Sequence, residues 1–399
     1  MKRYARAIGV VLLIVVVFGG GFLLGTAQPA LFVQAQTGQP PETEDLFRPF
    51  WEAWNIVHAR FVDIDQIDDN ALMEAALTGM LSALGDENTI YSTPAAFARQ
   101  NEDLQGTYEG IGATVRTDES TGGVRIVSTM NGSPARESLR QGDVILTVDG
   151  EDITGLSIND AVARIRGPAG TTVRLGVLRA GTSGILEVDV RRARITREFV
   201  TSAVFEGKIG YIAITQFSSS VTDDLAQALQ AMNANDLNGL VLDFRNDPGG
   251  LFDTAINVAR QFLNDGTIIV QRGRAGTPEV KHEATGTALA PDVPLAVLVN
   301  AGSASASELV AGALQSRGRA TVVGEVTFGK GSVQSISLLS NGGGLRVTIS
   351  RFFDALGGAI DGVGVIPDIY VPWTEDEMLA NPDYDPQLTE ALYFLRNRF

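Results

Sequence analysis

Two short segments of this 399-residue chain hold side chains that together are suited to acyl transfer. Residues 303–308 read S-A-S-A-S-E, and residues 324–334 read G-E-V-T-F-G-K-G-S-V-Q. A serine hydroxyl is a weak nucleophile unless a base takes its proton. The chain has no cysteine, and its two histidines lie outside both segments. Lys330 is therefore the candidate base for any serine chemistry here.

A lysine can serve as a general base only when its amine is neutral near neutral pH. Its ordinary pKa is about 10.4, and burial can lower that value by about 3–5 units. The residues around Lys330 are mostly small or apolar, and the nearest acid in the sequence is Glu325. If this segment is extended, Lys330 and Gln334 lie on one face, because side chains alternate along a strand. Gln334 is then placed to hydrogen-bond the neutral amine.

The residues alone leave alternatives open for both segments. They do not choose among Ser303, Ser305 and Ser307 as the nucleophile. Ser305 and Glu308 also fit S-x-x-E, the pattern of an ordinary helix capping box. A lysine flanked by glycines can cradle phosphate, but the motif G-x-x-x-x-G-K-[ST] is absent, because Gly331 follows Lys330.

The elements that position these segments follow an alternating pattern of strands and helices from Lys208 onward. Strands are predicted over 209–217, 239–244 and 295–299, and helices over 221–232, 251–263 and up to Leu314. The turns R-N-D-P-G-G (245–250) and A-G-S-A-S-A-S-E (301–308) each join a strand to a helix. Such turns present backbone N–H groups at a positive helix end, which favours developing anions. The pattern predicts an α/β layer.

Residues 106–193 have a different pattern, typical of a small β-barrel with one helix. Short strands are predicted at 124–127, 144–148, 173–178 and 185–190, between glycine-rich turns. Ser157 is a candidate cap for the helix, and Gly167-Pro168 ends it. The basic residues after this unit are expected to form a solvated strand or linker that pairs with acidic surface, with substrate guidance as the alternative: Arg191, Arg192, Arg194 and Arg197.

The flanking segments are predicted to be helical. Apolar residues recur at helical spacing over 46–83, and their aromatic members are expected to lie in the core or at a helix–helix interface. His58 has no evident partner and is interpreted as structural. A final helix is predicted over 387–396, with a role either in closing the core or in dimerisation, so a homo-oligomer is left open.

The N-terminus predicts export of most of the chain. Lys2, Arg3 and Arg6 precede an uncharged run over 7–27, whose 21 positions at about 1.5 Å each match a bilayer core. The basic flank stays inside, so residues 28–399 are expected outside the cytoplasm. The run is either a cleaved signal peptide or an uncleaved anchor, and its length favours the anchor. Residues 28–45 read as a linker.

The composition excludes several classes of function. With 44% apolar and 20% charged residues, the chain is globular and long enough for two or three domains. The net charge of −16 argues against nucleic acid as a partner, because phosphate binding needs a basic surface. Without cysteine there is no thiolate nucleophile and no zinc–thiolate site. No metal, nucleotide or other cofactor is implied.

Four ordered segments within residues 106–193 resemble a PDZ domain of the protease-associated kind. They are Y-E-G-I-G-A (108–113), N-G-S-P-A (131–135), G-D-V-I-L-T-V-D-G (142–150) and R-G-P-A-G-T (166–171). Such domains bind a free peptide C-terminus as an added strand. The resemblance implies a carboxylate-binding loop at Gly110, Ile111 and Gly112. Arg166 is placed either to sense the bound peptide or, as a solvent-exposed charge, to complement the helix dipole.

From about residue 45 to 370 the chain resembles the C-terminal processing peptidases, also called tail-specific proteases. The signatures in order are L-S-A-L-G-D (81–86), the PDZ segments, D-F-R-N-D-P-G-G (243–250), S-A-S-A-S-E, G-E-V-T-F-G-K-G-S-V-Q and G-V-G-V-I-P-D (362–368). The resemblance implies Ser305 as nucleophile, Lys330 as general base and Gln334 as the orienting third member. It also implies an oxyanion hole from the N–H groups of Ala306 and of Gly249 or Gly250.

Two departures from the family pattern bear on the substrate groove. Asp247 stands where asparagine is common, and residues 350–358 read S-R-F-F-D-A-L-G-G where relatives carry a strand rich in tyrosine and threonine. Neither touches the implied Ser/Lys dyad.

The sequence thus predicts a multi-domain protein with a helical segment, a PDZ-like barrel and an α/β, crotonase-like protease core. The expected boundaries are 1–27 signal peptide or anchor, 28–45 linker, 46–105 helical region, 106–193 PDZ domain, 194–372 protease core and 373–399 helical tail. The expected function is an extracytoplasmic serine endopeptidase that recognises the C-terminal tails of proteins. The alternatives are a membrane-tethered PDZ adaptor with an inactive core and a crotonase-like protein that binds a small ligand.

Overall fold

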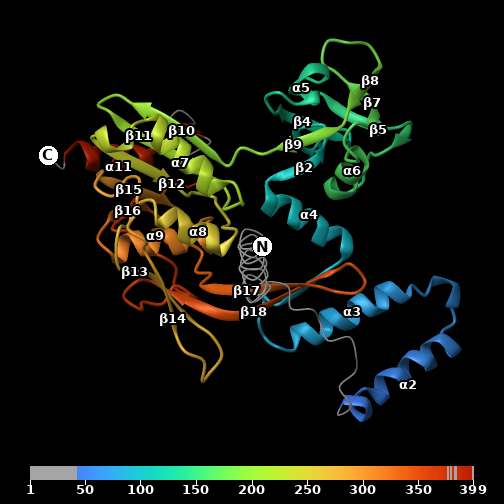
Figure 1. Ribbon diagram of the computed structural model, residues 1–399. Helices are drawn as coiled ribbons and strands as arrows, with labels where there is room; N and C mark the ends of the chain where they lie inside the picture. The colour runs from blue at the N-terminus through green and yellow to red at the C-terminus, as the bar shows by residue number, and fades with distance from the viewer. Residues whose placement is uncertain (1–42, 375–376, 378–379, 382–383, 398–399) are drawn as a thin grey trace, which may run out of the picture. The chain divides into compact units, whose positions relative to one another are not determined.

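The computed structural model describes residues 43–374, 377, 380–381 and 384–397. The predicted signal peptide or anchor, and the linker up to residue 42, lie outside the described residues. None of the helices in this described part is long and apolar enough to cross a membrane. The chain divides into two compact units, and Figure 1 labels their elements.

The first unit contains residues 43–98, 272–278 and 332–351 of the described chain. Its beginning is helical, as predicted, and its last part is an antiparallel hairpin. Its elements are α2 (Glu44–Arg60), η2 (Ile64–Gln66), α3 (Asp69–Ser82), β1 (Ile90–Ser92), the start of α4 (Pro94–Gln105), β17 (Ser332–Leu338) and most of β18 (Gly344–Phe353).

The aromatic side chains of α2 do not lie in a core, which corrects one of the two interpretations given above. No residue of α2 is buried, and Trp51 is 47% exposed. The rings pack on one another, with the Phe50 and Trp51 centroids 5.1 Å apart. They face α3, so the helix–helix interface is the interpretation that fits: Phe47, Phe50, Trp51 and Trp54 line one apolar groove with Met73, Ala76, Leu77 and Met80. His58 has a partner after all, Asp69, at 2.7 Å.

A β-bulge shapes the hairpin of the first unit. β18 pairs with β17 on one edge and with β1 on the other. Val333 lies opposite Ser350, whereas Gln334 lies opposite Thr348, so Ile349 is the additional residue. Directly opposed residues project on the same face of a sheet. The bulge therefore makes Gln334 and Thr348 side-chain neighbours. The shared face of Lys330 and Gln334 was conditional on an extended segment. Since β17 begins only at Ser332, no single strand contains both residues.

The second unit begins with the predicted small β-barrel. Its sheet has the order β3-β4-β5-β7-β8, with β6 on β5, and β2 pairs separately with β9. The cap of α6 is the predicted one, because Ser157 Oγ accepts the N–H of Asp160 at 3.2 Å. The elements are β2 (Thr107–Gly110), β3 (Ala113–Thr117), β4 (Val124–Thr129), α5 (Pro134–Ser138), β5 (Val144–Val148), β6 (Glu151–Asp152), α6 (Ile158–Ile165), β7 (Thr172–Leu178), β8 (Ile185–Arg191) and β9 (Ala193–Thr196).

The rest of the second unit is the predicted α/β layer. Its sheet has the order β10-β11-β12-β15-β16-β19, and all neighbours run parallel except β10 and β11. The elements are β10 (Val200–Phe205), β11 (Ile209–Ile214), α7 (Val221–Ala231), η3 (Ala234–Asp236), β12 (Gly239–Asp243), α8 (Phe252–Ala259), β13 (Thr267–Arg272), β14 (Val280–Glu283), β15 (Leu295–Val299), α9 (Ala306–Ser316), β16 (Ala320–Gly324), β19 (Ile369–Tyr370) and α11 (Pro386–Arg396).

Helix α8 ends at Ala259, four residues before the predicted end at Leu263. The N–H groups of Gln261 and Phe262 donate to carbonyls three residues back, so the helix tightens into a turn after Ala259. Strands β12 and β15 are buried at every position, as expected for parallel strands covered on both faces. Their carboxyl ends lead into the two turns that the sequence singled out.

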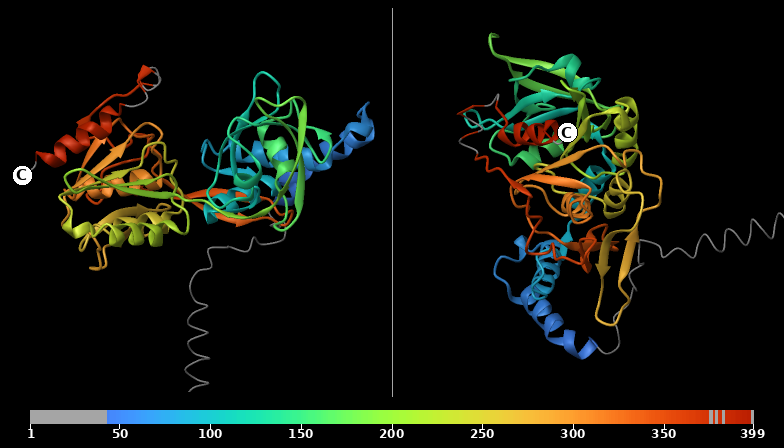
Figure 2. Two further views of the ribbon diagram at one scale, coloured as in Figure 1. Left: turned by 90° about the horizontal axis from the view of Figure 1, so that it is seen from above. Right: turned by 90° about the vertical axis from the view of Figure 1, so that its left-hand side faces the viewer.

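The C-terminal helix closes the core, which is one of the two roles considered for the tail. Ala391 and Leu395 of α11 pack into one cluster with Val241 of β12, Ala296 of β15 and Val323 of β16. Figure 2 shows α11 on one face of this sheet and α7 on the other. Arg245, which follows β12, also binds the tail, since its guanidinium contacts both Asp243 and Asp385.

Candidate active site and peptide pocket

The three serines of the turn after β15 have different surroundings. Ser303 and Ser307 are fully buried, and their hydroxyls donate to the backbone carbonyls of Phe244 at 2.7 Å and Asp247 at 3.0 Å. Ser305 is only half-buried and lies immediately before α9. The structure therefore separates the three residues that the sequence pattern alone left equivalent.

The backbone at Ser305 is strained. Its φ of 56° and ψ of −108° lie outside the regions that residues with a Cβ prefer. Such conformations persist only where the surroundings enforce them, and they cluster at functional sites. Here the turn places Ser305 at the positive end of α9. The N–H of Ala306, the first helical residue, has no partner within the helix and is available to an anion.

Glu308 links the serine turn to the segment that carries Lys330. Its side chain is fully buried, and its Oε2 accepts both the Ser305 N–H and the Lys330 N–H, each at 2.8 Å. Its Oε1 accepts the Gly329 N–H at 2.6 Å and the hydroxyl of Thr327. Four donors saturate a carboxylate. The capping-box acid predicted from the sequence thus also fixes the main chain of the two candidate catalytic residues around one oxygen.

The loop before Lys330 is also anchored from its other side. The hydroxyl of Thr327 accepts the Val365 N–H at 2.7 Å, and the Gly331 N–H donates to Asp361 at 3.1 Å. A Cβ on Gly331 would come within 2.5 Å of the Asp361 nitrogen, so only glycine fits there. This contact gives the G-V-G-V-I-P-D motif and its neighbour Asp361 a physical role. Lys330 itself is half-buried.

The turn over 245–250 packs directly against the serine turn. A Cβ on Gly249, whose φ is +96°, would lie 2.8 Å from the nitrogen of Ala306. The Gly249 N–H donates to Asp247 Oδ1 at 2.8 Å. Gly250 forms a parallel bridge with Phe217, in which the Phe217 N–H donates to the carbonyl of Gly249 and the Phe217 carbonyl accepts the Leu251 N–H. The N–H of Gly250 therefore points away from Phe217. Gly249 therefore lies beside Ser305 and Ala306, and Gly250 follows it in the same turn.

Asp247 is a buried acid in this cluster. It is fully inaccessible to solvent, and its Oδ2 has no hydrogen-bond partner in the described part of the chain. Burial raises the pKa of Asp247 to about 8, although hydrogen bonds with Gly249 and Ser307 act in the opposite direction. Asp247 thus lies buried in the turn that contains Gly249 and Gly250.

Gln334 belongs to the first unit, and the described bonds of its side chain stay within that unit. Its Nε2 donates to Ser332 Oγ at 2.8 Å and to Thr348 Oγ1 at 3.4 Å. Its role toward Lys330 remains a prediction.

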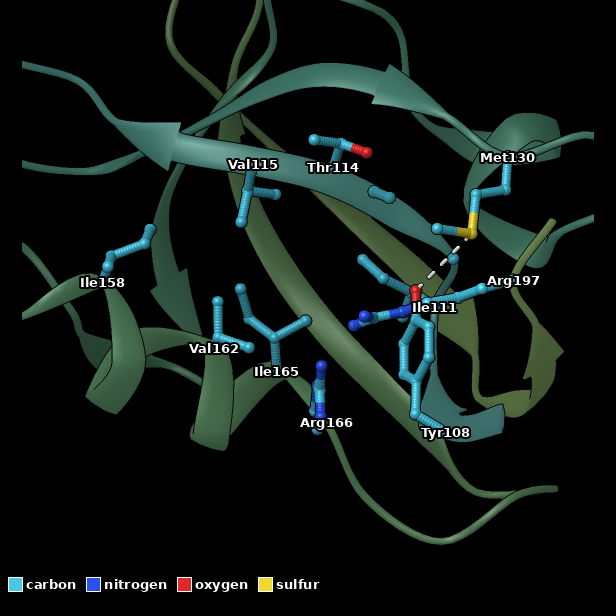
Figure 3. A pocket seen from close by; sticks show the side chains of 12 residues that line it. Tyr108, Ile111, Thr114, Val115, Met130, Ile158, Val162, Ile165, Arg166 and Arg197 are labelled. Atoms are coloured by element: carbon cyan, nitrogen blue, oxygen red, sulfur yellow. Dashed lines mark hydrogen bonds between the residues drawn. The ribbon is translucent and has the colours of Figure 1, made fainter. Parts of the chain in front are cut away.

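The barrel of the second unit has a cavity between β3 and α6. Figure 3 shows Thr114 and Val115 of β3 facing Ile158, Val162 and Ile165 of α6 across it. Of the predicted loop, Ile111 and Gly112 line this cavity, and Gly110 does not, because it is paired with Ala193 in the β2–β9 ladder. The walls are mostly apolar, so the cavity suits an apolar side chain.

Two arginines converge at one end of this cavity. The guanidinium carbons of Arg166 and Arg197 lie 4.5 Å and 5.1 Å from the centre of the Tyr108 ring. Each is paired with an acid of α4: Arg166 with Glu102 at 3.1 Å, and Arg197 with Asp103 at 3.0 Å. The side chain of Arg166 is only 23% exposed. The interpretation of Arg166 as a solvent-exposed charge is therefore wrong.

Arg197 and Arg192 correct the prediction that the basic run is a solvated linker. Arg197 lines the cavity. Arg192 is 9% exposed, and its guanidinium donates to the carbonyls of Ile165 and Arg164 at the end of α6. The predicted solvated strand is confirmed for Arg191 in β8 and Arg194 in β9, which are exposed, and the expected pairing with an acidic side chain is confirmed for Arg197.

Comparison with known proteins decides the family. Residues 208–371 match Peptidase family S41, and residues 102–178 match the PDZ domain. The carboxy-terminal-processing protease of Bartonella bacilliformis is 36% identical over 382 residues, which cover 94% of this chain and 86% of that protein. This chain belongs to the carboxy-terminal processing protease family. The carboxy-terminal processing protease CtpA of Bacillus subtilis is 33% identical and matches 92% of this chain and 78% of its own.

Solved structures agree with this membership. The photosystem II D1 C-terminal processing protease is 30% identical, with a TM-score of 0.50, covering 87% of this chain and 95% of that one. An S41 protease of Bacteroides fragilis, at 17% identity, shares the fold with a TM-score of 0.54 over 86% of this chain and 97% of its own. The predicted fold class, a PDZ-like barrel with an α/β protease core, is confirmed.

Sequence reasoning did not anticipate several members of these clusters. Thr327 and Arg197 had no motif of their own. Glu308 was read only as a local cap, although its bonds to residues 327–330 reach about twenty positions along the chain. The threonine and the acid do lie inside family signatures, which is the signal that could have found them. In the described part of the chain, no group of three or more His, Asp or Glu residues gathers as a metal site would.

Proposed function

We propose that this chain is a serine endopeptidase that cleaves proteins after capturing their free C-termini. Ser305 is the nucleophile, Lys330 the general base and Gln334 the residue that orients the lysine. The observation that carries this proposal is the shared carboxylate oxygen of Glu308, which accepts from the amides of both Ser305 and Lys330. Membership of the carboxy-terminal processing protease family supports the same assignment.

The proposed reaction is acyl transfer through a covalent intermediate. Ser305 Oγ bonds to the carbonyl carbon of the substrate as Lys330 Nζ accepts its proton. The carbonyl electrons move onto the oxygen, and their return breaks the C–N bond while Lys330 gives the proton to the leaving amine. Water then attacks the acyl-enzyme, again losing its proton to Lys330, and the collapse returns that proton to Ser305. Lys330 must be neutral at the start of each half-reaction.

The negative oxygen that forms in each half-reaction needs donors aimed at it. We assign this role to the N–H groups of Ala306 and Gly250. Ala306 begins α9, where the helix dipole favours an anion. Gly250 is preferred over Gly249, because the Gly249 N–H already donates to Asp247.

The PDZ domain is the proposed tail-binding site. An extended C-terminal peptide would add beside β3, with its carboxylate at the N–H groups of the loop over 110–112 and near Arg166. Ile158, Val162 and Ile165 make the adjoining cavity apolar. The proposed substrates are therefore unfolded or flexible proteins that end in an apolar residue.

The proposed site of action is outside the cytoplasm. This rests on the basic flank and the uncharged run over 7–27, which predict export with either a cleaved signal or a retained anchor. Membrane attachment through that run is part of the proposal.

The test compares Ser305→Ala and Lys330→Ala with the wild type on an unfolded test protein that has an apolar C-terminus. We expect both variants to lose at least about a thousandfold in kcat/KM, since a nucleophile and its base act as one unit. Lys281→Ala is the matched control, because Lys281 is an exposed lysine of β14. Full activity of Lys330→Ala would contradict the dyad. Tail binding without any cleavage by the wild type would favour the adaptor alternative.

A further inference from the structure

The L-S-A-L-G-D motif over 81–86 ends in an acid whose role the proposed reaction does not explain. Asp86 lies in the turn after α3, where its Oδ1 accepts the Asn88 N–H at 3.1 Å and its Oδ2 accepts the Thr89 hydroxyl at 2.6 Å. Hydrogen bonding with the side chain of Thr348 on β18 also acts to lower the pKa of Asp86. All these residues lie in the first unit.

The loop that carries Asp86 is fixed on the hairpin by a second bond. The buried hydroxyl of Thr89 accepts the Thr348 N–H at 3.1 Å. Because the same hydroxyl donates to Asp86, both bonding directions of Thr89 are used. Asp86 and Thr348 are thus held together by the main chain as well as by their side chains.

Thr348 also contacts Gln334, since the bulge at Ile349 places the two residues opposite each other. The direction of this contact follows from Asp86. A carboxylate only accepts hydrogen bonds, so the Thr348 hydroxyl must donate its single proton to Asp86. It can then only accept from Gln334, and its partner must be Nε2, not Oε1. Although burial acts to raise the pKa of Asp86, the hydrogen bonds from Thr348, Thr89 and Asn88 lower it overall, which keeps the acid ionised at neutral pH.

The same reasoning accounts for the whole amide of Gln334. Its Nε2 carries two protons, and it donates one hydrogen bond to the hydroxyl of Ser332 and one to the hydroxyl of Thr348. The Oε1 remains as an acceptor with a fixed direction. A lysine amine offers N–H donors in both protonation states, so an oriented Oε1 is the group that can hold it with its lone pair directed elsewhere.

We propose that Asp86 and Thr348 are positioning residues that fix the orientation of the Gln334 amide, with Oε1 left as its acceptor. Without Asp86 the hydroxyl of Thr348 can donate as well as accept, so the side-chain amide of Gln334 can flip and exchange the positions of Oε1 and Nε2. The relay of hydrogen bonds from Asp86 through Thr348 to Gln334 includes neither the substrate pocket nor the nucleophile. The inference rests on the proposed function in one respect, namely that Gln334 acts on Lys330.

The activity test uses the full-length protein with Asp86→Ala, Thr348→Val and Thr348→Ser. We expect Asp86→Ala and Thr348→Val to lower kcat by about tenfold, the usual effect of losing a partner that orients a catalytic group. KM should change by less than about twofold, because no binding contact is lost. Thr348→Ser keeps the hydroxyl and should retain most of the activity. Glu87→Ala is the matched control, an exposed acid next to Asp86.

A double-mutant cycle separates orientation from general destabilisation. In a Gln334→Ala background, Asp86→Ala should cause no further loss of kcat, since the amide that it orients is gone. An equal tenfold loss in both backgrounds would overturn the relay. A wild-type kcat in Asp86→Ala or in Gln334→Ala would also overturn the relay.

A spectroscopic readout keeps the relay testable apart from catalysis. In protein labelled with ¹⁵N at glutamine side chains, the two Nε2 protons of Gln334 should exchange slowly with water in the wild type and faster in Asp86→Ala, with Glu87→Ala unchanged. Unchanged exchange in Asp86→Ala overturns the relay. If the wild type and Ser305→Ala are equally inactive, the proposed function fails, and this exchange measurement still decides the relay.

Discussion

The serine turn and the PDZ pocket both rely on carboxylates, but they hold them differently. At the serine turn, the fully buried Glu308 is saturated by four donors. At the PDZ pocket, Arg166 and Arg197 each pair with a single acid of α4 whose side chain is 41% exposed. A buried charge with every bond satisfied is costly to disturb, whereas an ion pair open to water contributes little. The first arrangement therefore suits a preformed catalytic geometry, and the second suits groups that can exchange partners with a ligand carboxylate.

Among the variants that test this contrast, Glu308→Gln should have the largest effect on activity. The amide that replaces one carboxylate oxygen would face N–H or O–H donors that it cannot bind, so the serine turn and the lysine loop would separate. We expect loss of activity by at least about a hundredfold and loss of about 2–4 kcal/mol in the free energy of unfolding. Steady-state kinetics and chemical denaturation measure both. Glu325→Gln, a nearby acid that is not fully buried, is the control. A fully active, equally stable Glu308→Gln would remove the contrast with the PDZ pocket.

A pH-dependent effect on stability is expected from Asp247→Asn. The raised pKa of about 8 means that folded Asp247 keeps its proton at pH values where the unfolded chain has lost it. The wild type should therefore lose stability as the pH rises from about 4 toward 8, by up to about 1.4 kcal/mol per unit. Asparagine does not titrate, so its advantage over aspartate should grow over the same range. Thermal unfolding at pH 5 and pH 8.5 measures this difference, and a pH-independent difference would show that Asp247 is not the titrating group.

The smallest effect is expected from Glu102→Gln at the PDZ pocket. Its exposed pair with Arg166 should contribute less than about 1 kcal/mol to stability. Release of Arg166 should strengthen the binding of a peptide with a free, apolar C-terminus by about two- to threefold, and high salt should reduce this gain. Calorimetric titration of the peptide at two salt concentrations measures it. Weaker binding would mean that Glu102 supports the bound state instead of competing with the ligand.

The sequence predicted the fold class well because its signals are local. The strands of the barrel, the Ser157 cap and the alternating units of the core all follow from short-range periodicity and turn residues. What the sequence could not predict depends on distant contacts. Helical spacing indicated that the aromatic residues of α2 lie in the core or at a helix–helix interface, but only the structure shows that none of the described residues of α2 is buried.

The candidate site divides in the same way. The motif S-x-x-E predicted that Glu308 is part of a capping box with Ser305. It did not predict that the same carboxylate binds residues 327–330, because local patterns carry no information on loops that meet in space. The bulge at Ile349 could not be predicted from the sequence for a related reason. An additional residue in a strand is defined only by its partner strand, and it alone brings Thr348 opposite Gln334.

The most direct test of the central claim is the kcat/KM of the double variant Ser305→Ala/Lys330→Ala beside its two single variants, on the same unfolded substrate. If Ser305 and Lys330 act as one unit, each single variant falls to the same residual rate and the double variant falls no further. Losses that multiply in the double variant, or substantial activity in either single variant, would contradict the account.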